Sequence, residues 1–336
     1  MHPIEIIGGG LAGLALGRAL LKQGVPVVVH EAQDYPRHRV CGEFICGLQG
    51  AIIARLGLAP FFADAPRHRT MAWHWKEKLL SENRLPSPAI GVSRHALDHR
   101  LACDFSQHGG DLRTGSRVNA SDLRPGRVWA TGRRAGAGEW IGLKVHCRGL
   151  VPVADLEFHL GRGAYVGASA VEDGAVNVCG LFRRRSDIRA PAASLLPAYL
   201  RGCDMWTLTD RVESTAIPGT HAAVATVNFD RFPPDDRPLV GDAFAMIPPF
   251  TGDGMAMAFE GADLATEPMA GYSRGRLAWD RAAELVRRRL HTRFRRRLAL
   301  AGILQRFLIG AKGQACLAVA ARGGFLPFRV LFQWLH

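Results

Sequence analysis

The sequence has few of the features that mark secreted, membrane-spanning or metal-binding proteins. Its seven cysteines are an odd number and include no C-x-x-C pair, which argues against a disulfide framework and fits a reducing compartment. No charged-then-apolar leader precedes the first expected strand, and no uncharged run reaches the length of a membrane span. No cluster of histidine, cysteine and aspartate has metal-ligand spacing. We therefore expect a cytoplasmic protein without a bound metal.

The sequence also has fewer acidic than basic residues. The chain has 43 lysines and arginines against 30 aspartates and glutamates, which gives a formal charge of +13. This balance favours anionic partners, which include phosphates, an acidic carrier protein, a membrane surface and nucleic acid. With 336 residues, of which 48% are hydrophobic, the chain is long enough to bury a large core, and two domains are expected.

The N-terminus carries the strongest motif. Residues 3–7 read as a short buried strand, and Gly8, Gly10 and Gly13 follow in the pattern G-x-G-x-x-G at the start of a helical segment. A second strand, residues 25–30, ends at Glu31. Strand, helix and strand together predict a dinucleotide-binding β-α-β unit, with the glutamate placed to bind a ribose hydroxyl.

A second glycine-rich segment lies about 200 residues further on. Residues 237–242, which end in Gly241 and Asp242, lead into Ile-Pro-Pro-Phe-Thr-Gly-Asp-Gly-Met at 247–255, and an apolar helix is expected from there. The unpaired N–H groups and the positive dipole at a helix start suit a negative or electron-rich ligand that the backbone can approach closely. The alternative is a core helix with a well-defined start.

Two further features are the segment Arg39-Val40-Cys41-Gly42-Glu43 and an arginine, Arg94, at the start of an expected helix. Together with the two glycine-rich motifs, they resemble the flavoprotein superfamily that contains p-hydroxybenzoate hydroxylase and the geranylgeranyl reductases. The resemblance covers about half of the chain. It implies that Asp242 holds the ribityl chain of FAD, that Arg39 and Arg94 lie at its ribityl and phosphate groups, and that residues 252–255 approach the flavin. The cofactor-binding residues it implies are Gly8, Gly10, Gly13, Glu31, Arg39, Cys41, Gly42, Arg94, Gly241, Asp242, Pro249, Gly252, Gly254 and Met255.

The resemblance leaves the reaction open. The hydroxylase branch has an Asp-Gly motif before its substrate domain, whereas residues 127–132 of this chain end in Ala-Thr-Gly at that place. Asp173-Gly174 lies between two expected strands and reads as a hairpin turn. The Cys41-Gly42 segment looks closer to the reductase branch.

Alternating apolar and polar residues predict an antiparallel sheet, for example at residues 71–76, 141–146 and 156–160. Because these strands interrupt the FAD motifs, we expect an α/β protein with a Rossmann-like FAD-binding domain, an interleaved antiparallel β-sheet substrate domain and C-terminal helices. The expected limits are 1–67, 93–139 and 236–272 for the FAD-binding domain, 68–92 and 140–235 for the substrate domain, and 273–336 for the helical region.

Five residues of the expected substrate sheet are candidates for the wall of a pocket above the flavin: His74, His146, His159, Tyr165 and Cys179. Each such residue type more often packs or lies at a surface. The candidate catalytic residues are Cys41, whose motif places it near the flavin, and His146. The alternative for Cys41 is that its thiol only fills space.

The last sixty residues combine a basic helix with an apolar end. Seven arginines fall between positions 287 and 297, and residues 325–335 are rich in phenylalanine and leucine. One interpretation is a capping helix that closes the substrate cavity. The other is a surface that meets anionic lipid, which would make the protein membrane-associated, or an acidic carrier protein that presents the substrate. No nucleic-acid reader motif is present, and no nucleic-acid partner is expected.

The favoured function is that of an FAD-dependent monooxygenase that hydroxylates a small aromatic or polyketide-like substrate. NAD(P)H is expected to bind transiently as the reductant, because no second G-x-G-x-x-G follows a strand. The alternative enzyme is a flavin-dependent double-bond reductase similar to the geranylgeranyl reductases. A third hypothesis, a non-catalytic binder of lipids or prenylated proteins on the same fold, fits less well with an intact Glu31 and Gly241-Asp242.

Overall fold

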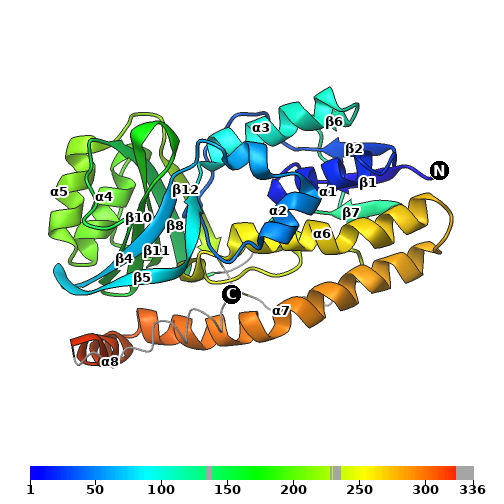
Figure 1. The fold of residues 1–336 in the computed structure, drawn as a ribbon. Helices are drawn as coiled ribbons and strands as arrows, with labels where there is room; N and C mark the ends of the chain where they lie inside the picture. Colours follow the sequence, from blue (N-terminus) through cyan, green and yellow to red (C-terminus); the bar gives the residue numbers. More distant parts are fainter. Residues whose placement is uncertain (134–137, 228, 230–235, 323–336) are drawn as a thin grey trace.

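We describe a computed structural model of the chain, in which residues 1–133, 138–227, 229 and 236–322 are described. Two halves lie side by side (Figure 1). A small parallel sheet with its helices forms one half, and a large curved sheet forms the other. The long helix α7 runs beneath both halves. The apolar end of the chain at 325–335 lies outside the described residues.

The small sheet is built by the N-terminal β-α-β unit. Its order is β6-β2-β1-β7, and all three strand pairings are parallel. The apolar helix α1 is buried along nearly its whole length, which its glycines permit by allowing close approach to neighbouring backbone. The elements of this half are β1 (Ile4–Ile7), α1 (Leu11–Leu21), β2 (Val27–His30), α2 (Gly50–Leu56), η1 (Ala59–Phe62), α3 (Arg94–Gln107), β6 (Asp111–Arg113), β7 (Arg127–Trp129), η3 (Gly241–Ala243), η4 (Pro249–Thr251) and α6 (Gly254–Ser273).

The large sheet has eight strands in the order β12-β8-β11-β10-β9-β4-β5-β3. It is antiparallel, as expected, except that β4 pairs with β9 in parallel. The strand β3 lies within the expected FAD-binding range but pairs with β5 of this sheet. The strands are β3 (Phe44–Ile45), β4 (Arg67–Trp75), β5 (Lys78–Gly91), β8 (Trp140–Arg148), β9 (Leu156–Gly161), β10 (Ala164–Ala170), β11 (Ala175–Arg183) and β12 (Ala222–Val227).

The turn between β10 and β11 is the short η2 (Glu172–Gly174). Its residues Asp173 and Gly174 both have positive φ angles, 59° and 68°. Glycine and aspartate tolerate this conformation better than most residues. The expected hairpin turn at this place is therefore confirmed.

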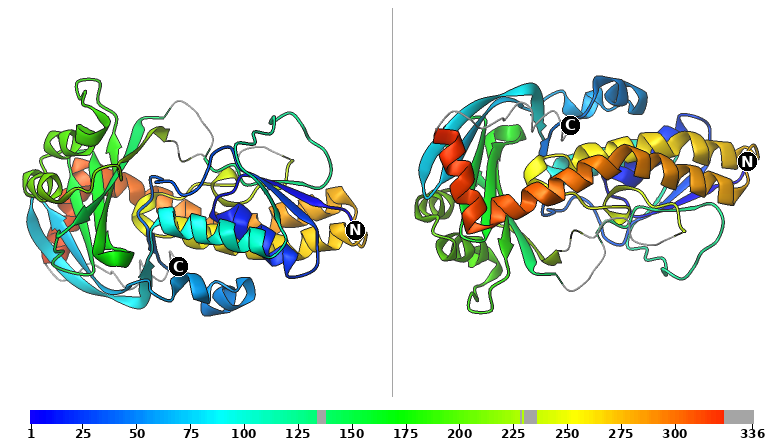
Figure 2. Two further views of the ribbon diagram at one scale, coloured as in Figure 1. Left: turned by 90° about the horizontal axis from the view of Figure 1, so that it is seen from above. Right: turned by 90° about the horizontal axis from the view of Figure 1, so that it is seen from below.

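Helices cover both faces of the large sheet. On one face, α4 (Ala192–Gly202) and α5 (Trp206–Thr215) pack against the alternating apolar residues of β8, β10 and β11. On the other face, the end of α7 (Trp279–Ile309) and α8 (Ala311–Arg322) contribute Leu308 and Leu317 to a second apolar cluster. Figure 2 shows α7 alongside α6 before it reaches the large sheet. The C-terminal helices therefore cover part of this second face.

A candidate cofactor and substrate site between the two halves

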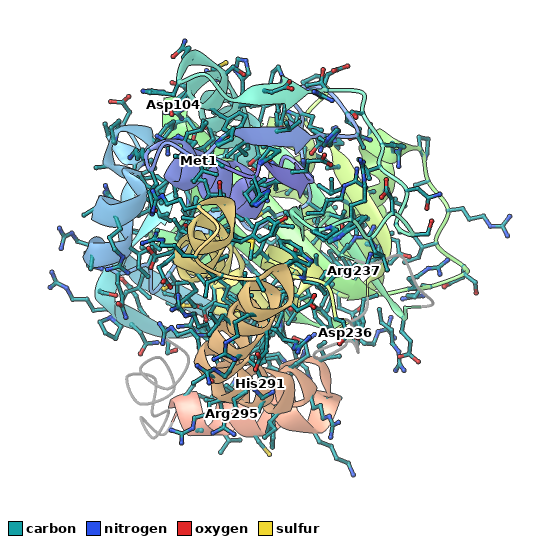
Figure 3. All side chains as sticks on the ribbon, turned by 90° about the vertical axis from the view of Figure 1, so that its right-hand side faces the viewer. Met1, Asp104, Asp236, Arg237, His291 and Arg295 are labelled. Atoms are coloured by element: carbon teal, nitrogen blue, oxygen red, sulfur yellow. The ribbon has the colours of Figure 1, made fainter. Side chains whose placement is uncertain are left out.

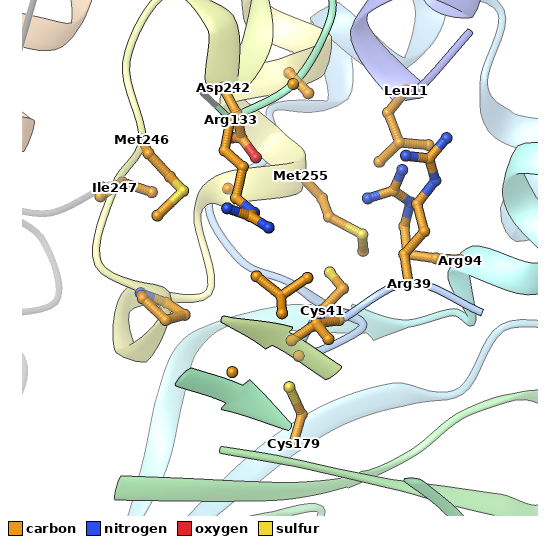
Figure 4. Close-up of a pocket in the computed structure, with 18 of the residues that line it drawn as sticks. Leu11, Arg39, Cys41, Arg94, Arg133, Cys179, Asp242, Met246, Ile247 and Met255 are labelled. Atoms are coloured by element: carbon orange, nitrogen blue, oxygen red, sulfur yellow. The ribbon is translucent and has the colours of Figure 1, made fainter. Parts of the chain in front are cut away.

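A continuous cavity of about 1110 Å³ lies between the two halves. This volume exceeds the roughly 300–1,000 Å³ of a typical small-molecule site, so the cavity has room for more than one small ligand. Figure 4 shows Arg39 and Arg94 on one side, Arg133 and Asp242 on the other, and Cys41 between them. All the cofactor-binding residues that the resemblance implied line this cavity except Gly13.

The three fingerprint glycines are required for different reasons. A side chain at Gly8, which has a φ of 114°, would overlap the backbone carbonyl of Ala130, and one at Gly13 would overlap the carbonyl oxygen of Gly8. At Gly10 the nearest atom to a hypothetical Cβ is a guanidinium nitrogen of Arg94, 3.9 Å away. Gly8 and Gly13 thus allow the tight turn and the helix packing, whereas Gly10 leaves space beside the N-terminus of α1.

Glu31 directly follows β2 and has a buried carboxylate. Its Oε2 accepts a hydrogen bond of 2.9 Å from the backbone N–H of Gly9, and its Oε1 pairs with Arg37 at 2.8 Å. Arg39 lies 3.5 Å from the same carboxylate. The glutamate therefore lies at the glycine turn, as the fingerprint predicts, and two arginines hold it there.

Arg94 and Arg39 share one buried carboxylate, that of Asp98 on α3. The guanidinium of Arg94 donates two hydrogen bonds to Asp98, at 2.7 and 2.8 Å, and Arg39 Nε lies 3.0 Å from Asp98 Oδ2. Burial alone would lower the pKa of Arg94, but the charge and hydrogen bonds of Asp98 outweigh it and raise that pKa. Asp98 thus holds both guanidinium groups at the cavity wall, where their planar donors suit a phosphate.

Asp242 faces the cavity from the opposite side. Its surface is exposed within the cavity, yet protein surrounds it closely enough that desolvation raises its pKa, partly offset by the charges of Arg94, Arg133 and Arg39. Gly241 before it has a φ of 63°, and a Cβ there would lie 2.9 Å from that of Ala12. This carboxylate is placed to accept hydrogen bonds from a hydroxyl-bearing ligand.

The loop before α6 completes the cofactor side of the cavity. Pro249 starts the short helix η4, and Gly252 ends it in a left-handed conformation with a φ of 73°, where a Cβ would crowd Phe44. Beyond it, a Cβ at Gly254 would meet nothing closer than 4.0 Å, and Met255 is buried. The first N–H groups of α6 are therefore accessible to a ligand at the cavity.

The Cys41-Gly42 segment is held by the large sheet. Asn177 on β11 donates hydrogen bonds from its amide to both carbonyl oxygens of this segment, at 3.0 and 2.8 Å. Cys41 and Cys179 both line the cavity, and burial raises the pKa of both thiols. Each thiol therefore stays protonated at neutral pH, a poor state for a nucleophile.

Glu43 follows this segment and joins the two halves. It adopts a φ of 54°, which is strained for glutamate, and is fully buried. Its carboxylate accepts hydrogen bonds from Lys144 and from the backbone N–H of Arg94 at 2.8 Å, and its other oxygen lies 2.6 Å from His146 Nε2. Burial would raise the pKa of Glu43, but the hydrogen bonds from His146 and Lys144 lower it. His146 is thus part of a buried ionic cluster, which we call the Glu43 cluster, and does not line the cavity.

The other candidates in the sheet divide into two groups. Tyr165 and Cys179 line the cavity, as expected. His74 and His159 instead stack on each other, with ring centroids 4.5 Å apart, and do not line it. His159 lies 3.0 Å from the buried Glu157, which also pairs with Arg211 of α5. These histidines therefore lie on the face of the sheet that α4 and α5 cover. Among the described residues, no group of histidine, cysteine, aspartate or glutamate could hold a metal ion.

Three of the seven arginines between positions 287 and 297 of α7 face α6, and the other four are exposed. Arg293 and Arg297 pair with the buried Glu260 at 2.6 and 3.1 Å, and Arg289 pairs with Glu267 at 2.6 Å. Arg295 is exposed on α7, where Figure 3 labels it. Within the described part of the chain, no helix has the length and apolar character needed to cross a membrane. Leu304, Phe307, Leu308 and Leu317 close the cavity from α7 and α8, as expected of a capping helix.

Comparisons with known proteins give two kinds of sequence relative. No protein-family model matches the chain. It is 32% identical over 147 residues to the FAD-dependent monooxygenase nscC of Arthroderma benhamiae, a match that covers 38% of this chain and 35% of that enzyme. It is 25% identical over 377 aligned positions to a menaquinone reductase of Mycobacterium tuberculosis, which covers 95% of this chain and 90% of that protein.

Solved structures extend the similarity over the whole chain. HpxO of Klebsiella pneumoniae, in complex with FAD and uric acid, matches with a TM-score of 0.77 at 16% identity, covering 99% of this chain and 95% of HpxO. A geranylgeranyl bacteriochlorophyll reductase-like protein of Thermoplasma acidophilum matches with a TM-score of 0.76 at 16% identity and the same coverage of both chains. The chain has the fold of the FAD-dependent flavoprotein oxidoreductases. The predicted fold class and the prediction of an FAD-dependent oxidoreductase are confirmed, and the similar proteins include a monooxygenase and reductases, as the resemblance implied.

Four residues of this flavoprotein site were missed from the sequence: Asp98, Lys144, Asn177 and Arg133. Asp98 had a local signal, since it lies four residues after Arg94 on a helix and can pair with it. Lys144 alternates with apolar neighbours in β8, which marks a polar face but does not identify its partner. Asn177 and Arg133 carried no comparable signal.

Proposed function

We propose that the protein binds FAD in this cavity and uses it, after reduction by NAD(P)H, to transform a largely apolar small molecule. The observation that carries the proposal is one continuous cavity that joins the glycine turn, the two arginines and Asp242 to an apolar chamber at the large sheet. A redox cofactor and its substrate must meet in one enclosed space, and this cavity provides it.

The residues present fit FAD. The space beside Gly10 and the N-terminus of α1 suits the pyrophosphate, and Arg94 supplies a fixed cation near it. Glu31 suits the adenosine ribose, Asp242 the ribityl hydroxyls, and the start of α6 at Gly254 the flavin. When bound, FAD supplies the hydride and electron chemistry, while the protein orients the substrate and excludes water.

For the reaction, we propose hydroxylation of a small aromatic or polyketide-like substrate. The chamber is lined by aromatic and aliphatic side chains, including Trp73, Phe158 and Phe250. Such a lining suits a planar apolar molecule and keeps bulk water away from the reaction. The partial match to a monooxygenase and the fold shared with HpxO support the same reaction class.

A second candidate, reduction of a carbon–carbon double bond, rests on a different observation. The relatives matched over 95% of this chain are menaquinone reductases, and the Cys41-Gly42 segment lies at the cavity between the arginines and the large sheet. In this case we propose Cys41, which lines the cavity, as the proton source; burial raises the pKa of its thiol and keeps it protonated.

The test starts with the cofactor and then separates the reactions. Purified protein should be yellow and release FAD when denatured; colourless protein that does not take up FAD would overturn the proposal. After reduction with NADPH, oxygen uptake that rises on addition of aromatic substrates, with labelled oxygen in the product, supports hydroxylation. Anaerobic turnover of an unsaturated substrate that is strongly reduced in Cys41→Ser supports the reductase instead.

A further inference from the structure

The C-terminal part of the chain has no acidic residue after Glu284. Beyond it the sequence has ten arginines and one lysine but no aspartate or glutamate. Four of these arginines are paired, three with carboxylates of α6 and one, Arg287, with Asp236. Among the described residues, the other basic side chains of α7 and α8 form no ion pair and are exposed: Arg288, Arg295, Arg296, Arg306, Lys312 and Arg322. The C-terminal helices therefore carry positive charge that the rest of the described chain does not neutralise.

Three of these arginines lie along one line of α7. Arg295 follows Arg288 by seven residues, which is about two helical turns, and Arg306 follows Arg295 by eleven, which is about three. Leu290 and Leu308, each two residues after one of these arginines, lie on the opposite side of the helix and are buried. In the view of Figure 1, α7 and α8 form the underside of the molecule, and Figure 3 shows Arg295 at this lower edge. The line of arginines thus faces away from the protein.

Exposed apolar side chains lie among these cations. Ile303 is 54% exposed and follows Arg295 by eight residues, so it lies on the same side of α7. Phe307, next to Arg306, is 50% exposed and also lines the cavity. A helix that combines basic residues with exposed large apolar residues is typical of helices that lie in the interface of a membrane. We call this surface the basic face and define it by Arg288, Arg295, Arg296, Ile303, Arg306, Phe307 and Lys312.

We propose that the basic face binds the surface of an anionic lipid bilayer, with its cations at the headgroups and its apolar side chains in the interface. This binding goes beyond the redox reaction and does not depend on it. Mobile anionic headgroups can gather around any array of cations, whereas an acidic protein must match their positions. Ile303 also favours the bilayer, because its exposed side chain gains an apolar environment there. Since Phe307 belongs to both the basic face and the cavity lining, this contact places one wall of the substrate chamber next to the lipid.

Vesicle sedimentation with the whole chain tests the proposal. We expect binding to vesicles of equal parts phosphatidylcholine and phosphatidylglycerol, much weaker binding to phosphatidylcholine alone, and a loss of affinity as the salt concentration is raised. Each cation at an anionic surface contributes a factor of roughly five in affinity, so Arg295→Gln/Arg306→Gln should bind roughly 20- to 30-fold more weakly. Ile303→Ser should lower the affinity roughly 3- to 10-fold, because it removes apolar area from the contact.

Arg69→Gln/Arg148→Gln is the matched control, because it removes the same charge from β4 and β8. Both arginines are exposed, and neither forms an ion pair within the described part of the chain. This variant should bind anionic vesicles like the wild type. All the variants should keep the unfolding temperature of the wild type, since every changed residue is exposed.

Three results would overturn the proposal. They are equal losses of affinity in the two double variants, unchanged affinity in Ile303→Ser, and binding to neutral vesicles as strong as to anionic ones. A fourth would assign the basic face to an acidic protein partner instead. In that case the wild type binds polyglutamate and not anionic vesicles, and Arg295→Gln/Arg306→Gln loses the binding to polyglutamate.

Discussion

The two ends of the cavity are built from opposite kinds of side chain. At the cofactor end, Glu31, Asp98 and Glu43 are buried carboxylates, each paired with arginine or lysine. At the substrate end, the wall consists of aromatic and aliphatic side chains, and its main polar contact joins Tyr165 to Gln305. One end thus has a rigid array of charges that fits a fixed cofactor, and the other has an apolar surface with few directional contacts.

The difference has an energetic consequence. Buried charges tolerate the loss of a partner poorly, because the remaining charge stays desolvated. Apolar walls tolerate exchange among side chains of similar volume, because the packing energy is spread over many weak contacts. Substitutions at the cofactor end should therefore cost stability or cofactor affinity, and substitutions at the substrate end should mainly change which ligands bind.

The largest expected effect is on the Glu43 cluster. Glu43→Gln leaves Lys144 as a buried cation without its carboxylate, so the free energy of unfolding should fall by about 3–5 kcal/mol. Chemical denaturation measures this change.

The control for this variant is Glu139→Gln, which removes the partner of Arg183 in an exposed pair of 3.0 Å. Exposed pairs contribute little to stability, so this variant should unfold like the wild type. Equal stabilities of the two variants would show that the Glu43 cluster does not hold the halves together.

Asp242 provides the next largest effect. Asp242→Ala removes a carboxylate that we propose accepts hydrogen bonds from FAD, and a charged hydrogen bond contributes roughly 1.5–3 kcal/mol. FAD affinity should fall at least tenfold, as measured by fluorescence titration of the cofactor. Phe158→Leu, at the opposite end of the same cavity, should leave FAD affinity unchanged. If both variants weaken FAD equally, the proposed division of the cavity is wrong.

The smallest expected effect is that of Glu157, a carboxylate on the face of the large sheet that α4 and α5 cover. Burial would raise the pKa of Glu157, but hydrogen bonds from His159 and Arg211 lower it from 4.5 to about 2. A carboxylate with a depressed pKa in the folded state contributes stability above pH 4.5 and loses it as the pH falls toward 2. Because Arg211 is partly exposed, we expect this contribution to be at most about 1 kcal/mol.

Glu157→Gln provides the measurement. The difference in unfolding free energy between the wild type and this variant should shrink as the pH is lowered from 4.5 to 2. A difference that stays constant over this range would mean that the carboxylate is not stabilised by its neighbours.

The sequence alone predicted the parts of the site that depend on short stretches of chain. The turn at Gly8, Gly10 and Gly13 follows from local backbone geometry, and the alternation in the large sheet follows from its two-residue period. The same reasoning could not predict that β4 pairs with β9 in parallel, since the pairing of strands depends on the path of the chain between them. The alternation in β8 indicated that His146 is a polar residue between apolar neighbours, but it could not predict that Glu43 is its partner.

By itself, the sequence determined the flavoprotein fold and the residues that line the cofactor end, because each motif is a contiguous segment whose conformation follows from its own glycines, strands and helix starts. Only the tertiary structure decided which side chains from other parts of the chain contact those segments. Glu43 and Lys144 are 101 positions apart. The neighbouring aromatic rings that line the cavity come from three separate parts of the chain: Trp73, Phe158 with Tyr165, and Phe250. Such contacts form when the two halves pack together, and no local pattern encodes the partner of a side chain that lies so far along the chain.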